Sequence, residues 1–425
     1  MLAFDLGASS GRAVKARYAG GTLSYEEVHR FENVPVEEGG TLFWDFDALL
    51  SEVHTGMERA GYFDSLGFDT WGVDFGLLDE QGILLGRPVH YRDGRTAGMA
   101  KRAARVLPPE TLYACTGNQI MDINTLFQLL AVKKQAPGQW ERAKKLLFLP
   151  DLLAHAVCGS LRCERSIAST SQMLDPAGGT WSGLVLQAYG IPSALFAPLV
   201  DTGTVIGTCR GAKNDRAAVV AVAGHDTQCA VAAMPAQTAD AAFLSCGTWS
   251  LLGCELDAPL LGRESMEAEL SNELGAGGKV NYLKNIIGLW LIQESRREWR
   301  RQGREYSYAE LERLALEAEP LRSLIDPDAP EFAPPGDIPQ RVRESCRRTG
   351  QPVPETVGQV MRCIYESLAL KYRVALGQLE RLTGRRFRVL HVLGGGAKDR
   401  LLCRMAADCC GIPVAAGPAG ATALG

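Results

Sequence analysis

The sequence predicts an α/β protein built from two related halves, and three observations support this fold class. A chain of 425 residues holds two or three domains at the usual size of ~150 residues each. Short apolar strands alternate with amphipathic helical segments along its length. A glycine- and serine-rich turn between two strands occurs twice, at Gly7-Ala-Ser-Ser-Gly11 and at Gly247-Thr-Trp-Ser250.

Composition and charge exclude several classes of protein. Apolar residues make up 46% and charged residues 22%, the balance of an ordinary globular protein. The net charge of −4 gives no general attraction to nucleic acid or to an anionic membrane. The longest apolar runs, such as residues 217–223, are far shorter than a membrane span, and the first residues lack the basic start of a signal peptide. The twelve cysteines contain no Cys-x-x-Cys pair, so we expect buried free thiols in a cytoplasmic protein.

The first glycine turn is expected to connect two strands of a hairpin. Residues 2–6 are short and apolar, and residues 12–18 alternate before Gly20 and Gly21 turn the chain into a third strand, residues 22–30. A dinucleotide or P-loop turn would lead into a helix instead. A hairpin turn of this kind directs backbone N–H groups and hydroxyls into one concavity, which suits phosphate oxygens. The second turn lies between strands at residues 242–246 and 251–255, so each half offers a phosphate-binding hairpin.

The remaining segments are assigned in chain order. We expect strands and a hairpin turn within residues 66–85, and helices at residues 125–134 and 144–158. A buried strand at residues 215–224 leads His225, Asp226 and Thr227 to the start of a helix. Amphipathic spacing then predicts helices at residues 283–301 and 357–382, followed by a strand at 387–393, a glycine turn and a helix at 398–410.

Asp226 is the candidate general base. A carboxylate between a buried strand and a helix is often only an N-cap, and that alternative stays open on the local pattern. The helix dipole would keep such an aspartate ionised, able to accept the proton of an alcohol that attacks a γ-phosphate. His225 and Thr227 beside it could orient a hydroxylated substrate.

Three other sequence features can be interpreted either as part of a binding site or as purely structural. Asp5 lies on an apolar strand, where it could organise Mg²⁺ through water or simply bond to the adjacent turn. The triplet Gly394-Gly-Gly396 could expose bare backbone to a flat nucleoside or allow tight packing. Asn285 and Gln293 would lie about 12 Å apart along one helix. They could contact a small substrate at one end and a nucleotide at the other, or they could simply be exposed polar residues.

Taken together, these motifs resemble the FGGY carbohydrate kinases of the actin/Hsp70/hexokinase superfamily, and within them the kinases that act on L-rhamnulose. The resemblance covers the chain from end to end, in order, and the matching segments are Asp5-Leu-Gly-Ala-Ser-Ser-Gly-Arg12, Asp69-Thr-Trp-Gly-Val-Asp-Phe75, Tyr91-Arg-Asp-Gly-Arg-Thr96, His225-Asp-Thr227, Gly247-Thr-Trp-Ser-Leu251, Leu283-Lys-Asn-Ile-Ile-Gly-Leu-Trp-Leu-Ile-Gln293 and His391-Val-Leu-Gly-Gly-Gly396. It implies two related actin-like (ribonuclease H-like) domains with an active-site cleft between them. The domains would be residues 1–230, with the sugar site and the first hairpin, and residues 231–425, for the nucleotide.

The resemblance also implies roles for individual residues. Asp226 would be the catalytic base and Asp5 the Mg²⁺-organising acid. The ketose would contact Gly72, His225, Asp226, Thr227 and Asn285. ATP would contact Ala8, Ser9, Ser10, Gly11, Arg12, Thr248, Gln293 and Gly395. The implied reaction converts ATP and L-rhamnulose into ADP and L-rhamnulose 1-phosphate, with Mg²⁺ as the cofactor.

The sequence departs from the family pattern at two places. Cys246 stands where a hydroxyl residue is common, which a hairpin acting through its backbone should tolerate. The chain stops at Gly425, where relatives continue with further helix, so we expect the second domain to be short at its C-terminal end. Two alternatives remain: a kinase for another ketose, such as L-fuculose or xylulose, and a non-catalytic actin-like sensor of nucleotide or sugar.

Overall fold

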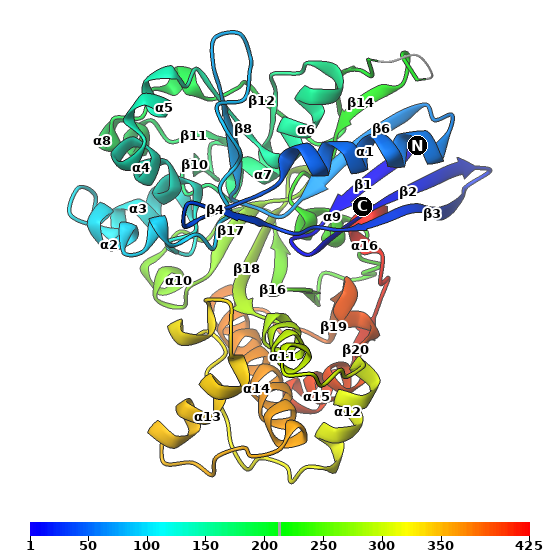
Figure 1. The fold of residues 1–425 in the computed structure, drawn as a ribbon, viewed down its shortest axis with the longest axis vertical. Helices are drawn as coiled ribbons and strands as arrows, with labels where there is room; N and C mark the ends of the chain where they lie inside the picture. Colours follow the sequence, from blue (N-terminus) through cyan, green and yellow to red (C-terminus); the bar gives the residue numbers. More distant parts are fainter. Residues whose placement is uncertain (211–213) are drawn as a thin grey trace. The chain divides into compact units, whose positions relative to one another are not determined.

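The computed structural model describes residues 1–210 and 214–425, which fall into two compact units. The first unit contains the described residues of 1–233 together with 255–282 and 422–425, and the second contains 234–254 and 283–421. The chain passes from one unit to the other within the strands β16 (Trp249–Leu256) and β18 (Val280–Ile287). The protein therefore has the predicted two-domain α/β fold (Figure 1).

The first unit is built on a six-stranded mixed sheet. Its strands, in spatial order, are β13 (Thr204–Thr208), β14 (Ala218–Ala221), β6 (Ser65–Thr70), β1 (Leu2–Leu6), β2 (Ser10–Ala19) and β3 (Thr22–Glu32). The buried central strands are apolar, and Phe4 of β1 stacks on Phe68 of β6 with their ring centroids 5.3 Å apart. Helix α1 (Phe46–Ala60) packs against β1, β2 and β3 (Figure 1). Its Gly56 permits this approach, because a Cβ there would lie 2.7 Å from the ring of Phe4.

Shorter elements complete the first unit. Its further helices are α2 (Met99–Ala103), α3 (Pro109–Thr116), α4 (Thr125–Gln135), α5 (Pro137–Arg142), α6 (Leu149–Cys158), α7 (Arg165–Ser169), α8 (Gly183–Tyr189), α9 (Asp226–Ala232) and α10 (Arg263–Glu267). Its short strands are β4 (Val36–Glu38), β5 (Thr41–Phe43), β7 (Phe75–Leu78), β8 (Lys145–Phe148), β9 (Cys163–Glu164), β10 (Leu174–Asp175), β11 (Thr180–Trp181), β12 (Leu199–Val200) and β17 (Ser271–Leu274). The last helix, α16 (Ala421–Leu424), starts at the unit boundary.

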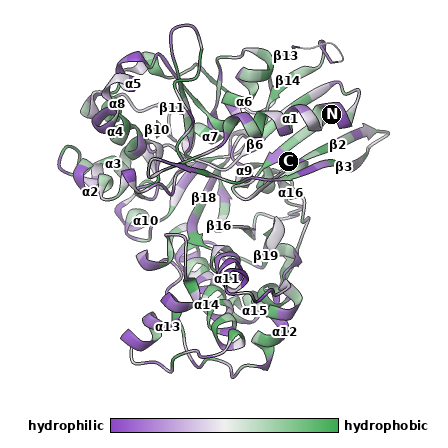
Figure 2. Ribbon diagram, in the orientation of Figure 1, coloured by the Kyte–Doolittle hydropathy of each residue, from purple (hydrophilic) through white to green (hydrophobic). Residues whose placement is uncertain are grey.

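The second sheet also has six strands, in the order β17, β18, β16, β15 (Ala241–Cys246), β19 (Val389–Leu393) and β20 (Val414–Ala416). The helices of the second unit are α11 (Trp290–Arg301), α12 (Tyr308–Glu317), α13 (Ile338–Arg348), α14 (Val357–Thr383) and α15 (Arg400–Cys410). Helix α14 packs along α12 and α15 (Figure 1). Helices α11 and α13 are largely hydrophilic, whereas α14 carries a long buried apolar stripe (Figure 2).

The two sheets share one strand order over five of their six strands, which confirms the prediction of related halves; the sixth strands, β13 and β17, do not correspond. In the first, β1 pairs antiparallel with β2 and parallel with β6, with Leu6 opposite Gly11. In the second, β15 pairs antiparallel with β16 and parallel with β19, with Cys246 opposite Ser250. Both glycine turns are therefore hairpin turns that follow the central strand of a sheet. Strands β14 and β20 continue the parallel arrangement beside β6 and β19.

Two predicted helices are wrong in part. Residues 145–148 form β8, and the helix expected over 144–158 begins only at Leu149. Residues 283–287 belong to β18, and α11 begins at Trp290. Asn285 therefore lies on a strand, and the predicted helical track from Asn285 to Gln293 is wrong. Among the described helices, none combines the length and apolarity needed to span a membrane.

Candidate functional site

Three strand ends bring the predicted residues of the first unit to one edge of its sheet. Strands β1, β6 and β14 run parallel, so their carboxyl ends meet at the same edge. The first hairpin turn follows β1, Gly72 follows β6, and His225 follows β14. The N–H of Thr70 donates to the carbonyl of Gly224 at 2.9 Å, which ties the end of β6 to the segment before His225.

Asp226 is the first residue of α9, and His225 occupies the N-cap position, so Asp226 is not the N-cap. The Asp226 side chain remains 29% exposed, whereas that of His225 is 9% exposed. His225 Nε2 lies 3.4 Å from Asp226 Oδ1, and the Thr227 hydroxyl donates to the same oxygen at 3.3 Å. Burial raises the pKa of Asp226 and His225 opposes the shift, with a net rise. The helix dipole was expected to keep Asp226 ionised, which would lower its pKa, so the rise differs from that expectation. A higher pKa makes the carboxylate a stronger proton acceptor.

Gly72 lies directly against His225. A Cβ on Gly72 would lie 3.2 Å from Thr170 Cγ2 and 3.4 Å from His225 Nε2, so it would press on Thr170 and reach van der Waals contact with the imidazole. The next residue, Val73, has a φ of 68°, a backbone conformation that β-branched residues rarely adopt. Its N–H donates to Thr170 Oγ1 at 3.1 Å and its carbonyl accepts from Thr125 Oγ1 at 2.7 Å. These two bonds hold a strained turn beside the imidazole, as is common at functional sites.

Asp5 is held by Arg12 and Thr422. Arg12 donates to Asp5 Oδ2 through Nε at 2.8 Å and through a terminal nitrogen at 2.5 Å, and the Thr422 hydroxyl donates to the same oxygen. Asp5 also faces Asp69 as its register partner on β6. Asp69 is 2% exposed, and within the described residues its Oδ1 has no hydrogen-bond partner. Burial, reinforced by the charges of Asp5 and Asp226, raises the pKa of Asp69 well above its usual value.

The first hairpin turn includes Ala8, Ser9, Ser10 and Gly11, and three carbonyls of residues 7–10 accept hydrogen bonds from Gly7 and Asn33. The N–H of Gly7 donates to Ser10 O at 2.9 Å, and Asn33 donates to Ser9 O and Gly7 O, each at 3.1 Å. Because the carbonyls are occupied, the turn can present N–H groups and hydroxyls to an anion. Gly11 is required here because a Cβ would overlap the ring of Phe31.

In the second unit, Thr248, Gln293 and Gly395 lie near one edge of the sheet. The Thr248 hydroxyl donates to Gln293 Oε1 at 3.3 Å, and the N–H of Leu289 donates to Gly247 O at 3.0 Å. Strands β15 and β19 are parallel, so the turn at Gly247 and the glycine triplet leave the sheet at the same end. Asn285 lies on β18 of this unit, two residues before Ile287, whose N–H donates to Asp328 Oδ1 at 2.8 Å.

The glycine triplet contains three different environments. Gly394 has a φ of 76° and lies against the Cys246 carbonyl, where a Cβ would be 3.2 Å from the oxygen. Gly395 faces open space, with nothing within 4 Å of a Cβ position. Gly396 lies against the Cys246 side chain. Gly396 therefore fits the packing interpretation, whereas the backbone at Gly395 is uncovered.

Sequence reasoning missed several residues of the first unit. Glu164 (2% exposed) accepts from the N–H of Gly224 at 3.0 Å, and Glu273 (4% exposed) accepts from His225 Nδ1 at 2.8 Å. Both come from segments far away in the sequence, so no local motif marks them. Asp69 lies within the segment Asp69–Phe75 that resembles the kinase family. A charged residue on an apolar strand is the one sequence feature that could have marked it as part of the site.

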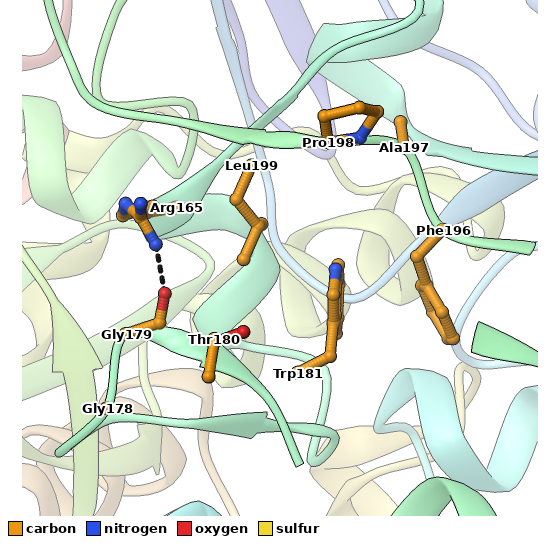
Figure 3. Close-up of a pocket in the computed structure, with 9 residues that line it drawn as sticks. All are labelled: Arg165, Gly178, Gly179, Thr180, Trp181, Phe196, Ala197, Pro198 and Leu199. Atoms are coloured by element: carbon orange, nitrogen blue, oxygen red, sulfur yellow. Dashed lines mark hydrogen bonds between the residues drawn. The ribbon is translucent and has the colours of Figure 1, made fainter. Parts of the chain in front are cut away.

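One surface pocket of about 360 Å³ lies apart from these residues. Its lining contains no predicted site residue and consists of Arg165, Gly178, Gly179, Thr180, Trp181, Phe196, Ala197, Pro198 and Leu199 (Figure 3). Within the part of the chain that the structure describes, no group of three or more His, Cys, Asp or Glu side chains suits a metal ion.

Comparison with known proteins defines the class. The model of the FGGY family of carbohydrate kinases, N-terminal domain, matches residues 1–233, and the C-terminal domain of the same family matches residues 242–425. The chain belongs to the FGGY family of carbohydrate kinases and is a carbohydrate kinase.

Curated relatives of the chain carry the name rhamnulokinase. The chain is 43% identical to the rhamnulokinase of Bacteroides thetaiotaomicron, over 100% of this chain and 88% of the relative. It is 40% identical to the rhamnulokinases of Enterobacter sp. (strain 638) and Enterococcus faecalis, over 100% of this chain and 87% of each relative.

Solved structures share the fold at low identity. A ligand-bound xylulose kinase from Lactobacillus acidophilus matches with a TM-score of 0.78 at 14% identity, covering 100% of this chain and 87% of that one. Plasmodium falciparum glycerol kinase with ADP matches with a TM-score of 0.76 at 12% identity and the same coverage.

Proposed function

We propose that this carbohydrate kinase transfers the γ-phosphoryl group of ATP to O1 of L-rhamnulose, in the cytoplasm, as a step of L-rhamnose breakdown. The observation that carries the proposal is the contact of Gly72, His225 and Asp226 at one sheet edge. These residues lie within the segments that resemble kinases of L-rhamnulose, and the curated relatives named rhamnulokinase match the chain from end to end.

Asp226 serves as the general base in this proposal. The O1–H bond of the ketose breaks, and its proton passes to the Asp226 carboxylate. O1 forms a bond to the γ-phosphorus, while the bond from that phosphorus to the β,γ-bridging oxygen breaks and its electron pair leaves on ADP. Because phosphoryl transfer needs mainly positioning and charge stabilisation, one base and well-placed donors are sufficient chemistry for the protein.

His225, Thr227 and Asn285 are proposed to read the ketose hydroxyls, and Gly72 lets the sugar approach backbone. Inverting one hydroxyl leaves a buried polar group unpaired, which costs roughly 1–3 kcal/mol. Replacement of the sugar's methyl group by a hydroxyl is discriminated by only ~1–3 kcal/mol in an apolar pocket. We therefore expect stereochemistry to set the preference, with weaker activity on related ketoses.

The nucleotide is assigned to the two hairpins and the glycine triplet. Backbone and hydroxyl donors of residues 8–12 and of Thr248 would hold phosphate oxygens, while Gln293 and Gly395 would contact the nucleoside. ATP-bound Mg²⁺ supplies neutralisation of phosphate charge. Asp5 fits a water-mediated contact to that ion: Arg12 and Thr422 bond only to Oδ2, and Mg²⁺ commonly keeps its waters and uses one carboxylate.

A substrate panel tests the proposal. We expect the highest kcat/KM for L-rhamnulose in an ADP-release assay that also contains L-fuculose, L-xylulose, D-xylulose, L-ribulose and glycerol. If another ketose exceeds L-rhamnulose by about tenfold, which corresponds to ~1.4 kcal/mol, the substrate assignment fails and the kinase class stands. Absence of ADP release with every sugar would instead favour a non-catalytic sensor.

A further inference from the structure

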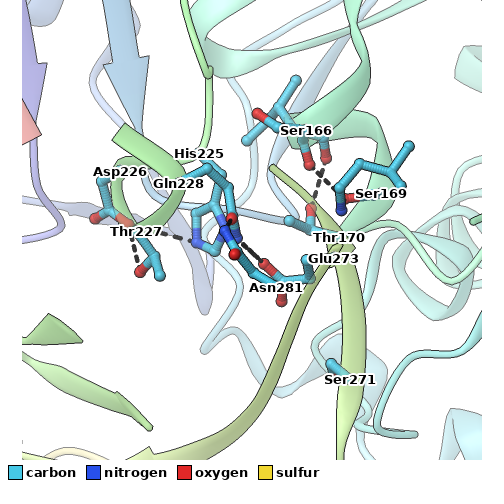
Figure 4. A network of polar contacts seen from close by, with 12 residues as sticks. Ser166, Ser169, Thr170, His225, Asp226, Thr227, Gln228, Ser271, Glu273 and Asn281 are labelled. Atoms are coloured by element: carbon cyan, nitrogen blue, oxygen red, sulfur yellow. Dashed lines mark hydrogen bonds and ion pairs between the residues drawn. The ribbon is translucent and has the colours of Figure 1, made fainter. Parts of the chain in front are cut away.

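A buried chain of polar side chains leads away from His225 (Figure 4). His225 Nδ1 lies 2.8 Å from Glu273 Oε2 on β17, and the Gln228 amide donates to the same carboxylate oxygen at 2.7 Å. Asn281 of β18 donates in turn to Gln228 Oε1. Glu273, Gln228 and Asn281 are each at most 4% exposed, so water does not replace these bonds.

The Glu273 carboxylate determines which imidazole nitrogen carries a proton. An ionised carboxylate only accepts hydrogen bonds, so Nδ1 must be the protonated, donating nitrogen. Nε2 is then the nitrogen directed at the site, where it lies 3.4 Å from Asp226 Oδ1 and beside the Cα of Gly72. Hydrogen bonding at one ring nitrogen thus fixes the function of the other.

The charges around His225 favour its protonated form. Burial alone lowers the pKa of His225, but Glu273, Asp226 and Glu164 together outweigh it, so the net shift is upward. These three carboxylates come from β17, α9 and β9, respectively. A doubly protonated ring presents an Nε2–H donor to the site, and a singly protonated ring would present only an acceptor there.

We infer that Glu273 is a positioning residue for the kinase reaction. It holds His225 as an imidazolium whose Nε2–H, 3.4 Å from Asp226 Oδ1, donates to a sugar oxygen next to the attacking hydroxyl. The inference rests on the proposed function for its substrate. Glu273 itself touches neither ATP nor sugar in this account and acts through His225 alone. A purely structural role would predict lost stability without any change in the charge of His225.

Glu273→Gln tests the inference because it keeps the shape of the side chain and removes its charge. We expect the titration midpoint of His225, followed by ¹⁵N NMR of the imidazole and assigned with His225→Asn, to fall by about one pH unit or more. The KM for the ketose should rise about tenfold or more while the KM for ATP changes little. Glu273→Asp, which retains the charge, should recover part of both effects.

Glu366→Gln is the matched control. Glu366 is 6% exposed on α14 of the second unit and pairs with Arg362 at 2.5 Å, so the variant loses a buried carboxylate elsewhere. It should leave the His225 midpoint and the ketose KM unchanged. An unchanged His225 midpoint in Glu273→Gln would overturn the inference, and so would equal ketose KM increases in both variants. Because the NMR readout needs no sugar, a wild-type preference for another ketose would refute the substrate assignment without affecting this result.

Discussion

The Cα of Gly396 lies against the side chain of Cys246, so closely that a Cβ on Gly396 would overlap Cys246 Sγ and lie 2.6 Å from its Cβ. This contact joins the glycine triplet after β19 to the strand that carries the second hairpin. The two neighbouring glycines therefore differ: Gly396 is needed for packing, whereas a Cβ on Gly395 would meet nothing within 4 Å.

Gly396→Ala should therefore destabilise the protein. Overpacking a close contact typically costs about 1–3 kcal/mol, and the free energy of unfolding in urea should fall by that amount. Gly395→Ala is the matched control: it should leave this free energy within about 0.5 kcal/mol of wild type and weaken ATP binding if the nucleoside lies on this backbone. Equal losses of stability in the two variants would contradict the assignment.

The Cys246 thiol should react slowly and independently of nucleotide. Cys246 is 1% exposed, and burial raises the pKa of its thiol to about 12, which suppresses the reactive thiolate. We expect mass spectrometry after iodoacetamide treatment to show the same slow labelling of Cys246 with and without saturating MgATP. Protection by MgATP would mean that the thiol faces the bound nucleotide instead.

Asp74 should make stability depend on pH. Burial raises its pKa to about 6, although hydrogen bonds from Gln128, Trp44 and Trp71 oppose the shift. The folded state then binds this proton more tightly than the unfolded state, so stability is expected to decrease as pH rises from about 4 to 6, by up to ~3 kcal/mol. Urea unfolding of wild type and Asp74→Asn across this range should show a flatter profile for the variant. Parallel profiles would assign the pH dependence to other groups.

Local patterns were sufficient to predict the elements that carry most of the site. The two hairpins were predicted from glycine turns between alternating strands, and the residue range of α14 from its helical spacing and the glycine that follows it. The start of α9 after a buried strand was likewise predicted correctly. In each case the determining residues are neighbours in the sequence, so periodicity and turn chemistry suffice.

The sequence failed to predict secondary structure and site residues where contacts between distant parts of the chain determine them. Residues 283–287 have helical apolar spacing but lie on β18, where almost every residue is buried and periodicity carries no information. Gly288, between β18 and α11, packs against the Ser250 backbone: a Cβ there would lie 2.8 Å from the Ser250 nitrogen, and the sequence does not display this contact. Glu273 is likewise invisible from sequence, since it lies 48 residues from the histidine that it contacts.

The central claim is that Asp226 is the general base, and Asp226→Asn tests it most directly. The variant keeps the size of the side chain but removes the proton acceptor. We expect kcat with saturating MgATP and ketose to fall by on the order of 10²–10⁴, while the calorimetric Kd for ATP stays close to that of wild type. Asp337→Asn controls for the substitution itself. Asp337 is a true N-cap, whose carboxylate accepts a hydrogen bond from the N–H of Gln340 at 3.0 Å, and this variant should retain near wild-type kcat. Turnover of Asp226→Asn within about threefold of wild type, a barrier difference of only ~0.6 kcal/mol, would contradict the assignment of Asp226 as the base.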